Sequence, residues 1–330
     1  MSVFSRAKHF GGRIVQETRE FPARLKEYGF KVASATFLDG LVPPEKHPFY
    51  IRTIESYVDR FMEPIVHKYE KHPVNEKLEH KEGKVPVWCC WWQGVENMPE
   101  LVRMCNDRLR SFLPEEAELR MLTAENYRDY VQLPSWVMEK FEAGKMSITA
   151  LSDILRVALL AECGGFWIDS TVFISHYFPM EFIRQDYYAQ RMYDPVKLKH
   201  EACKGRWSGF LVGGKPGNVI FCLLRDAFYA WWKEHDSVVD YVIFDYFLLS
   251  GYKKVPAIRE QVDRLPDNNR DVFEMYQVLH LAYTPELYAR LTANTNLHKL
   301  TYKIDLTEQT PDGEQTLYAY LRQITAEVQI

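Results

Sequence analysis

The chain has 330 residues, 41 of them basic and 45 acidic, and a formal net charge of −4, so no overall basic field argues for a nucleic-acid partner. Apolar residues make up 47% and charged residues 26% of the sequence, as is ordinary for a globular protein with a sizeable core. No apolar run reaches the roughly 18 residues that could span a bilayer, so we expect no transmembrane helix.

The six cysteines form no CxxC pair, which favours buried free thiols in a reducing compartment. The first residues also lack the apolar segment of a secretory signal peptide. Both features predict a cytoplasmic protein.

Residues 1–80 are predicted to be helical. The segment 13–32 is expected to be a helix interrupted at Pro22, and apolar residues recur at helical spacing in 49–72. Residues 1–31 carry seven Lys or Arg against three Glu. Such a basic start can lie on an anionic membrane, at the periphery of its inner face, or it can be an ordinary solvated helix face.

After a polar break at residues 80–86, the pattern changes to alternating strands and helices. Strands are predicted at 85–94, 118–123 and 166–174, and helices at 98–114, 147–161 and 218–233, the last of which follows the stretch 210–217. This order predicts an α/β fold with a mainly parallel, doubly wound sheet, in which ligands bind beyond the carboxyl ends of the strands. The predicted domains are a helical N-terminal extension, 1–80, and an α/β domain, 81–330.

The helix ITALSDILRVALLA, residues 148–161, is apolar at ten of its fourteen positions. Its polar residues, spaced i, i+3, i+4 and i+7, form one narrow line along the helix; they are Thr149, Ser152, Asp153 and Arg156. The line is either a solvent-facing stripe with an Asp153–Arg156 pair or the wall of a ligand cleft, where Arg156 grips a phosphate or sugar and Asp153 accepts from hydroxyls. Spacing alone favours neither interpretation.

The strand FWIDSTVFI, residues 166–174, holds one acid, Asp169, within an apolar run. A buried carboxylate is costly unless it is paired or metal-bound. At the carboxyl end of a strand it can instead face a ligand crevice, although a structural Asp capped by backbone amides is the alternative.

The stretch SDILRVALLAECGGFWIDSTV resembles the signature of the capsular polysaccharide synthesis proteins, which are related to family 32 glycosyltransferases and more distantly to the clostridial toxin glucosyltransferases. That signature has an S-D-x-x-R helix, a Gly-Gly turn and a strand ending in D-x-D. KVPVWCCWWQG resembles the first strand of these enzymes, and YVIFDYFLLS and LHKLTYK resemble later blocks. The likeness extends from Val85 to Lys303 and is densest between Ser152 and Val172.

The resemblance implies a GT-A fold that moves a sugar from a nucleotide-sugar donor to a hydroxyl. By motif position, Trp91 would stack on the nucleotide base and Gln93 would also contact the donor. Core packing is the alternative for Trp91, as for its neighbours Trp88 and Trp92, and the choice among the three stays open.

In the same motifs, Asp153 and Arg156 would touch the ribose and the donor sugar. Asp169 would be the first acid of D-x-D, at the ribose and the metal, and a candidate catalytic residue. Ser170 would contact the donor.

A divalent cation, Mn²⁺ or Mg²⁺, is the cofactor that the resemblance implies, because the departing diphosphate gains negative charge. This sequence departs from the family pattern, since Thr171 replaces the second acid and offers only a hydroxyl. The metal is then held loosely, by Asp169 and Thr171 with the donor phosphates and a late histidine, His298, or a cation such as Lys299 does part of its work at the diphosphate. A surface histidine is the alternative for His298.

Asp245, in IFDYFLL, is a second acid in an aromatic setting, and it either acts as a base, positions the acceptor or is structural. The glycine-rich stretch 207–218 lacks the spacing of a phosphate-binding P-loop and is expected to form a loop that lines the sugar site.

These features together predict a retaining hexosyltransferase that builds a surface or capsular polysaccharide, with a UDP-sugar as donor and a glycan or lipid-linked acceptor. The loss of the second acid at Thr171 supports an alternative, a non-catalytic member that binds a sugar nucleotide or a glycan. A two-carboxylate glycoside hydrolase has little support, because no pair of acids stands out.

Overall fold

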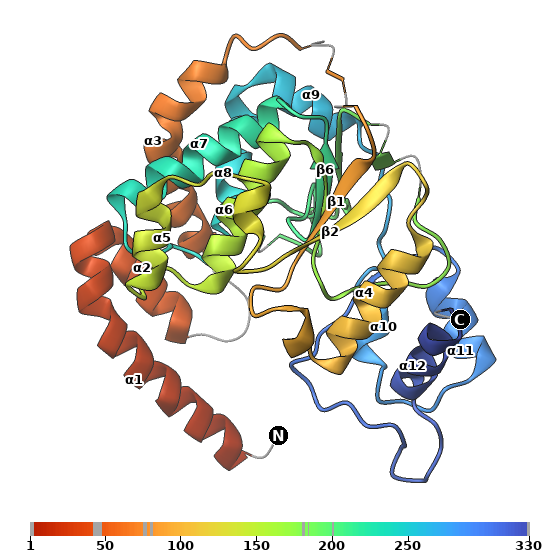
Figure 1. Ribbon diagram of the computed structural model, residues 1–330. Helices are drawn as coiled ribbons and strands as arrows, with labels where there is room; N and C mark the ends of the chain where they lie inside the picture. The colour runs from red at the N-terminus through yellow and green to blue at the C-terminus, as the bar shows by residue number, and fades with distance from the viewer. Residues whose placement is uncertain are drawn as a thin grey trace.

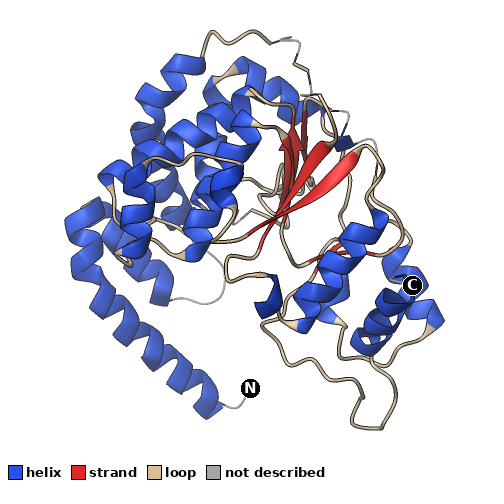
Figure 2. Cartoon of the chain, in the orientation of Figure 1, coloured by secondary structure: helices blue, strands red, loops and turns tan. Residues whose placement is uncertain are grey.

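The computed structural model describes residues 3–41, 48–74, 78–79, 82–179, 182–183, 185–199 and 201–328, and for residues 3–13 the backbone alone. A five-stranded sheet lies at the centre, with helices on both of its faces (Figures 1 and 2). The strands are β1 (Val85–Cys90), β2 (Ala117–Leu122), β3 (Gly165–Ile168), β4 (Val172–Ile174), β5 (Tyr187–Ala189), β6 (Leu211–Gly214) and β7 (Leu297–Lys299). The helices are α1 (Val3–Tyr28), α2 (Phe30–Leu41), α3 (Pro48–Tyr69), η1 (Val95–Asn97), α4 (Glu100–Phe112), η2 (Tyr127–Asp129), α5 (Ser135–Glu142), α6 (Ile148–Glu162), α7 (Val219–Glu234), α8 (Ile243–Lys254), α9 (Pro256–Arg264), α10 (Glu274–Gln277), α11 (Pro285–Thr292) and α12 (Leu317–Val328).

The large sheet has the strand order β2-β1-β3-β6-β5 and is mostly parallel. Strand β1 pairs in parallel with β2 and β3, whereas β6 pairs antiparallel with both β3 and β5. Four of the five strands therefore run in one direction, and β6 alone of these five runs against them. The predicted α/β class and mostly parallel sheet are confirmed.

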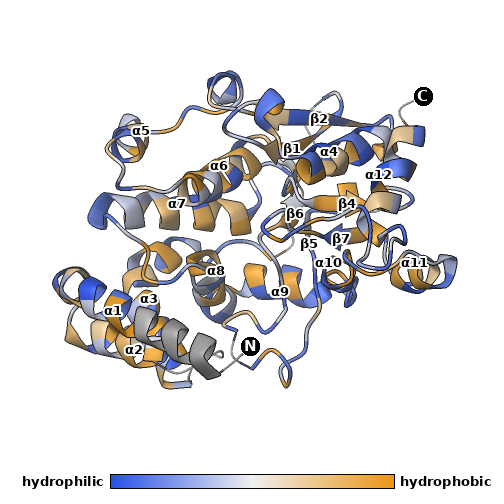
Figure 3. Ribbon diagram, turned by 90° about the horizontal axis from the view of Figure 1, so that it is seen from below, coloured by the Kyte–Doolittle hydropathy of each residue, from blue (hydrophilic) through white to orange (hydrophobic). Residues whose placement is uncertain are grey.

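The chain winds to both sides of β1. It leaves β1 through α4 to reach β2, then returns through α5 and α6 to β3 on the other side of β1. Helix α4 packs against β4 and α12, whereas α6 packs against α7 beyond the other face of the large sheet (Figure 3). In such a sheet the connections after β1 and β3 diverge, which opens a crevice at the carboxyl ends of these strands.

Helix α6 has clear local causes for its two ends. Ser147 caps its first turn, because its hydroxyl accepts a hydrogen bond from the amide of Ala150 at 3.2 Å. The chain then turns through Gly164 and Gly165, both with positive φ. A Cβ on Gly165 would lie 2.1 Å from the carbonyl oxygen of Pro86, so only glycine lets β3 pair this closely with β1. The predicted helix over 147–161 is confirmed.

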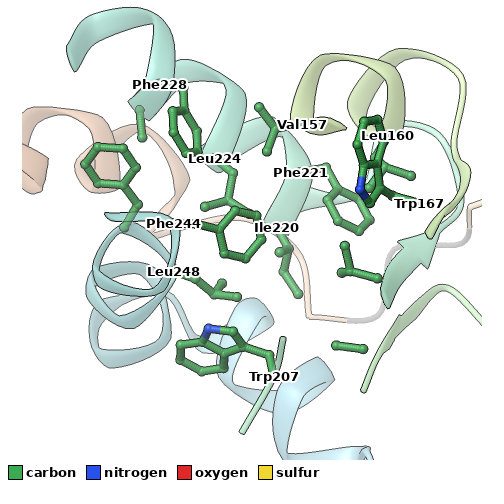
Figure 4. Close-up of a cluster of buried hydrophobic side chains, with 14 of the residues drawn as sticks. Val157, Leu160, Trp167, Trp207, Ile220, Phe221, Leu224, Phe228, Phe244 and Leu248 are labelled. Atoms are coloured by element: carbon green, nitrogen blue, oxygen red, sulfur yellow. The ribbon is translucent and has the colours of Figure 1, made fainter. Parts of the chain in front are cut away.

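The main hydrophobic core fills the space between the large sheet and helices α6, α7 and α8 (Figure 4). Figure 4 shows side chains from these helices packed together with two tryptophans. The labelled side chains are Val157, Leu160, Trp167, Trp207, Ile220, Phe221, Leu224, Phe228, Phe244 and Leu248. Because Trp167 and Trp207 also reach the crevice, their rings connect a rigid core to the polar groups described below.

One expected strand is broken in the structure. The prediction of a single strand over 166–174 is wrong, since β3 ends at Ile168 and β4 begins at Val172. The amide of Val172 donates to the carbonyl oxygen of Asp169 at 3.0 Å, which closes a tight turn between the two strands. Strand β4 then leaves the large sheet and pairs antiparallel with β7. The turn therefore exposes Asp169 at the carboxyl end of β3.

The expected interruption at Pro22 is also wrong, because α1 runs through this residue to Tyr28. Proline removes one backbone donor, but Pro22 is exposed, so water can satisfy the carbonyl group that loses its partner.

Helix α3 packs against α7 and α8 and contributes to the main core. The hydroxyl of Tyr50 in α3 donates to the carboxylate of Asp240, just before α8, at 2.8 Å.

The division of the chain at residue 80 into a helical extension and an α/β domain stays a prediction. In the described part of the chain, no helix combines the length and the apolar character that a membrane span requires.

Candidate active site

A cavity of about 810 Å³ lies at the carboxyl ends of β1 and β3. This is the position at which doubly wound sheets bind their ligands, where the chain reverses its direction of winding. Residues from six segments line the cavity, within 90–93, 148–156, 167–171, 192–210, 241–276 and 299–303.

The polar line of α6 faces this cavity. All four of its residues, Thr149, Ser152, Asp153 and Arg156, belong to the cavity wall. Arg156 is largely buried, and its Nη1 donates to Asp153 Oδ1 at 2.8 Å. Of the two interpretations that the sequence left open, the structure supports the cleft wall.

Asp169 is the meeting point of two cations. Its Oδ2 accepts from Lys299 Nζ at 2.7 Å, and its Oδ1 lies 3.5 Å from Arg156 Nη2. The indole Nε1 of Trp167 donates to the same Oδ1 at 2.9 Å. Lys299 Nζ also donates to Thr171 Oγ1 at 2.8 Å. The carboxylate is therefore fixed in place while 29% of its side chain stays exposed.

Burial and neighbouring cations oppose each other at both acids, and the net shift in pKa differs between them. Burial alone would raise the pKa of Asp169, but the charges of Lys299 and Arg156 hold it below its ordinary value. For Asp153, burial outweighs the charge of Arg156 and raises the pKa to about 6. The ionised form of Asp169 is therefore favoured, whereas Asp153 changes its charge near pH 6.

The three tryptophans of strand β1 and its end take different positions. Trp88 is fully buried and donates to the carbonyl oxygen of Gly164, so it belongs to the core. Trp91 and Trp92 both line the cavity. Both are half-buried, but Trp92 packs on Tyr127 and Phe141 with ring centroids 5.3 Å and 5.6 Å apart, whereas Trp91 meets only the Tyr302 ring, edge to face with centroids 5.7 Å apart, among the aromatic contacts of the described residues. Trp91 is thus the better placed of the two to offer a ring face to a base.

Gln93 and Ser170 also line the cavity, Gln93 as an exposed residue after β1. The backbone carbonyl of Ser170 lies 3.4 Å from Asn106 Nδ2, a donor on the neighbouring helix α4. This contact helps to hold the turn that carries Asp169.

Asp245 lines the cavity from the first turn of α8. Its Oδ1 accepts from Trp207 Nε1 at 3.0 Å, so a core tryptophan holds this acid in the same way that Trp167 holds Asp169. Burial and the nearby charge of Asp245 raise the pKa of the Cys203 thiol, which also hydrogen-bonds to this carboxylate.

His298 does not reach this cluster. It is fully buried, it does not line the cavity, and its Nε2 lies 3.2 Å from Ser175 Oγ. Neighbouring residues of a strand point to opposite faces, so when Lys299 of β7 faces Asp169, His298 faces away. Burial also lowers the pKa of His298 to about 3. His298 therefore does not lie beside Asp169 and Thr171, as a shared metal site would require.

The side chains around Asp169 do not fit a divalent cation held by the protein. Mg²⁺ and Mn²⁺ prefer several oxygen ligands, usually with carboxylates among them. Here the second acid is replaced by Thr171, and the ammonium of Lys299 lies against both oxygen groups. Within the described residues, no group of three His, Cys, Asp or Glu gathers in a way that could hold a metal ion.

We expected the glycine-rich stretch 207–218 to form one loop. This prediction is wrong in part, because the middle of the stretch forms β6. Since β6 runs antiparallel to β3, its beginning lies at the cavity and its end at the opposite edge of the sheet. Ser208, Gly209 and Phe210 accordingly line the cavity, whereas the GGKPG segment does not.

Sequence reasoning missed several residues of the site. Trp167 could have been found, because it stands two residues before Asp169 and such residues share one face of an extended chain. Trp207 is 38 positions from its partner Asp245, and no local pattern links them. Tyr241, Tyr302 and Lys303 also line the cavity; they lie in the stretches YVIFDYFLLS and LHKLTYK, within which the sequence pattern assigned them no role.

Comparison with known proteins places these features in a family. The model of the capsular polysaccharide synthesis protein family matches residues 44–321, which contain the whole cavity. No curated protein matches the sequence. A solved structure described as "PaToxG Glycosyltransferase" is similar at 15% identity and a TM-score of 0.30, over 64% of this chain and 95% of that chain. Because the family model covers most of the sequence, the chain belongs to the capsular polysaccharide synthesis protein family.

Proposed function

We propose that the protein transfers a hexosyl group from a nucleotide-sugar donor, a UDP-sugar in our expectation, to a hydroxyl of a glycan or lipid-linked acceptor in the synthesis of a surface polysaccharide. The observation that carries the proposal is the convergence of Arg156 and Lys299 on Asp169 at the switch point of an α/β sheet. Membership of the capsular polysaccharide synthesis protein family supports it.

The donor diphosphate fits the cationic end of the cavity. When the bond between the sugar and the diphosphate breaks, the leaving group gains negative charge, and fixed cations lower the energy of that state. Lys299 is 21% exposed and Arg156 9%, so both are held by the fold before any substrate arrives. The nucleotide then extends toward Trp91 for stacking and toward Asp153 for its ribose hydroxyls, with Gln93 beside it.

The acceptor and the reacting sugar fit the other end of the cavity, which contains Asp245 and Trp207. Aromatic faces are suited to sugar rings. Asp169 is engaged by Lys299 and Trp167, and Asp245 accepts from Trp207, so both acids serve as fixed acceptors. In this proposal the reaction retains the anomeric configuration, needs no protein base at the acceptor, and uses Asp245 as a positioning residue. The anomeric configuration of the first product, read by NMR, tests retention.

A lipid-linked acceptor would place the protein at a membrane surface, and the N-terminal helices are suited to it. In α1 and α2, apolar side chains such as Val15 and Phe30 are exposed, as are basic ones such as Arg19 and Lys31. This combination is typical of helices that lie on anionic lipid. Flotation with vesicles that contain anionic lipid is expected to carry the protein, and flotation with purely zwitterionic vesicles is not.

The proposal is tested with a panel of nucleotide sugars, each scored by the release of nucleoside diphosphate. One donor is expected to turn over, and Asp169→Asn is expected to abolish the turnover. Asp236→Asn is the matched control, because Asp236 pairs with Lys140 and Lys145 away from the cavity. Full activity in Asp169→Asn contradicts the proposal.

A non-catalytic protein that binds a sugar nucleotide or a glycan is the second candidate. The observation that favours it is Thr171, because its hydroxyl stands where a second acid is usual and is bonded to Lys299. Calorimetric binding of a nucleotide sugar without turnover of any donor, with or without Mg²⁺ and Mn²⁺, would support this candidate over the transferase.

A further inference from the structure

Lys299 is fixed at the turn that carries Asp169. Strands β4 and β7 pair antiparallel with Val172 opposite Lys299, and the amide of Leu300 donates to the carbonyl oxygen of Thr171 at 2.9 Å. The backbone amide of Lys299 donates to Val272 on its other side. The backbone at Lys299 is therefore held from both sides, and only the side chain can move.

The ammonium group of Lys299 lies between two oxygen groups, at the place where a metal ion would be expected. Nζ of Lys299 lies 2.7 Å from Asp169 Oδ2 and 2.8 Å from Thr171 Oγ1, and 5.4 Å from the centre of the Phe210 ring. In the family pattern, the side chains at positions 169 and 171 are the two acids that face a metal. Here the same two positions hold an ammonium. An ammonium has three N–H donors, so the two bonds to these oxygens leave a third for a phosphate oxygen.

Thr171 stands in place of the second acid of D-x-D, and this replacement is electrostatically consistent with the ammonium of Lys299 beside it. A divalent cation at Asp169 would lie against the ammonium, and like charges at this distance repel strongly in a partly buried site. Thr171 gives the ammonium a neutral acceptor, whereas a second carboxylate would make the site more acidic and more attractive to a metal. Arg156, on the other side of Asp169, supplies a second positive charge at 3.5 Å.

We propose that Lys299, with Arg156, supplies the positive charge that stabilises the departing nucleoside diphosphate, so that the reaction needs no divalent cation. This inference rests on the proposed function. In the step itself, the bond from the anomeric carbon to the β-phosphate oxygen breaks and its electron pair stays on that oxygen. The acceptor oxygen forms the new bond to the anomeric carbon, and its proton passes to the diphosphate or to water. Lys299 and Arg156 donate hydrogen bonds to the oxygens that gain charge.

The inference is tested by calorimetry with UDP, GDP and inorganic pyrophosphate as probes, on protein freed of metal and kept in EDTA. At least one nucleoside diphosphate is expected to bind under these conditions, and added Mg²⁺ or Mn²⁺ is expected to change its dissociation constant by less than about threefold. Lys299→Met is expected to weaken binding by about tenfold or more and to lower turnover by about a hundredfold. Lys299→Arg keeps the charge and is expected to recover part of the binding.

Lys215→Met is the matched control. Lys215 pairs with Asp186 at 2.7 Å and is 20% exposed, so its setting is close to that of Lys299, but it does not line the cavity. A thermal unfolding curve for each variant separates a loss of binding from a loss of the fold.

A converse variant sharpens the test. Thr171→Asp combined with Lys299→Met restores the acid and removes the ammonium, and this double variant is expected to bind nucleoside diphosphate only when Mn²⁺ or Mg²⁺ is added. Metal-independent binding by the double variant contradicts the inference.

The two possible failures are distinct. Binding that appears only with a divalent cation in the wild type, or unchanged binding in a folded Lys299→Met, overturns the inference and leaves the proposed function in place. If no nucleoside diphosphate binds with or without metal, the proposed function itself is wrong and the inference falls with it.

Discussion

The two ends of the cavity use the same structural device for different purposes. At each end a core tryptophan donates its indole N–H to a carboxylate, Trp167 to Asp169 at 2.9 Å and Trp207 to Asp245 at 3.0 Å. Asp169 lies in a turn between strands of two sheets, where Lys299 and Arg156 approach it. Asp245 lies at the start of α8, beside the Cys203 thiol. The aromatic core fixes both acids; in the proposed function, the cations beside Asp169 make this the phosphate end of the cavity, and Asp245 lies at the sugar end.

The largest expected effect comes from changing each acid to its amide. Asp169→Asn is expected to lower the turnover of the donor by about a thousandfold, both in transfer and in hydrolysis without acceptor, because Lys299 and Arg156 lose the charge that positions them. Asp245→Asn is expected to leave donor hydrolysis intact and to raise the KM for the acceptor by about tenfold. Comparing hydrolysis with transfer in both variants checks this assignment. Equal loss of hydrolysis in the two variants contradicts the separation of the two ends.

A second change acts on the phosphate end without removing any charged group. A Cβ on Gly209 would lie 2.9 Å from Nη1 of Arg156, so Gly209→Ala pushes this guanidinium away from Asp153. Because charge-assisted hydrogen bonds to a phosphate are strong, the dissociation constant for nucleoside diphosphate is expected to rise by about thirtyfold.

Gly251→Ala is the control for this change. A Cβ there meets Ile258 at 3.0 Å in the core, outside the cavity, so donor binding is expected to stay unchanged. Similar binding losses in both glycine variants would point to general damage to the fold.

The base-binding assignment of Trp91 predicts a smaller effect. Trp91→Ala is expected to raise the dissociation constant for nucleoside diphosphate by about tenfold, as loss of one stacked base contact does. The affinity for inorganic pyrophosphate, which has no base, is expected to stay the same. Trp136→Ala is the control, because Trp136 is also half-buried but packs on Tyr229 outside the cavity. Equal losses for pyrophosphate and nucleotide contradict a stacking role.

The smallest expected effect is a pH dependence at the ribose contact. Asp153 has a pKa of about 6, raised from 3.8, so its carboxylate is mostly ionised at pH 7.5 and mostly protonated at pH 5.5. The affinity for nucleoside diphosphate is expected to fall about fourfold over this interval in the wild type, relative to Asp153→Asn. The phosphate group titrates equally with both proteins, so the ratio of the two affinities isolates Asp153. A ratio that does not change with pH contradicts the assignment.

The same raised pKa has a defined effect on stability. Between about pH 4 and pH 6 the folded protein holds a proton on Asp153 that the unfolded chain has lost, so the contribution of this group to the free energy of unfolding falls as the pH rises. Asp153→Asn is expected to remove this slope from the pH profile of chemical unfolding.

The sequence predicted the parts of the site that depend on local patterns. The polar line of α6 could be read from its spacing of i, i+3, i+4 and i+7, and the position of Asp169 followed from a glycine turn and an apolar strand. Such features can be predicted because a helix face and a strand end are determined by residues close together in the chain.

The remaining features depend on contacts between distant segments. Lys299 and Asp169 are 130 positions apart, and their contact exists only because β7 pairs with β4 in a particular register. That register also decides that Lys299 faces the cavity and that His298 does not, and a strand of three residues shows no alternation from which to predict this. The antiparallel direction of β6, which moved the GGKPG segment to the far edge, has no local signal either.

The account is tested most directly by the release of nucleoside diphosphate from a panel of nucleotide sugars, measured in EDTA and in excess Mg²⁺ or Mn²⁺, for the wild type and for Lys299→Met. We predict release from one donor at similar rates in both conditions for the wild type, and a loss of about a hundredfold in Lys299→Met. Release that depends entirely on the added metal, or that persists in Lys299→Met, would contradict the central claim that the ammonium at Asp169 serves as the cation of this site.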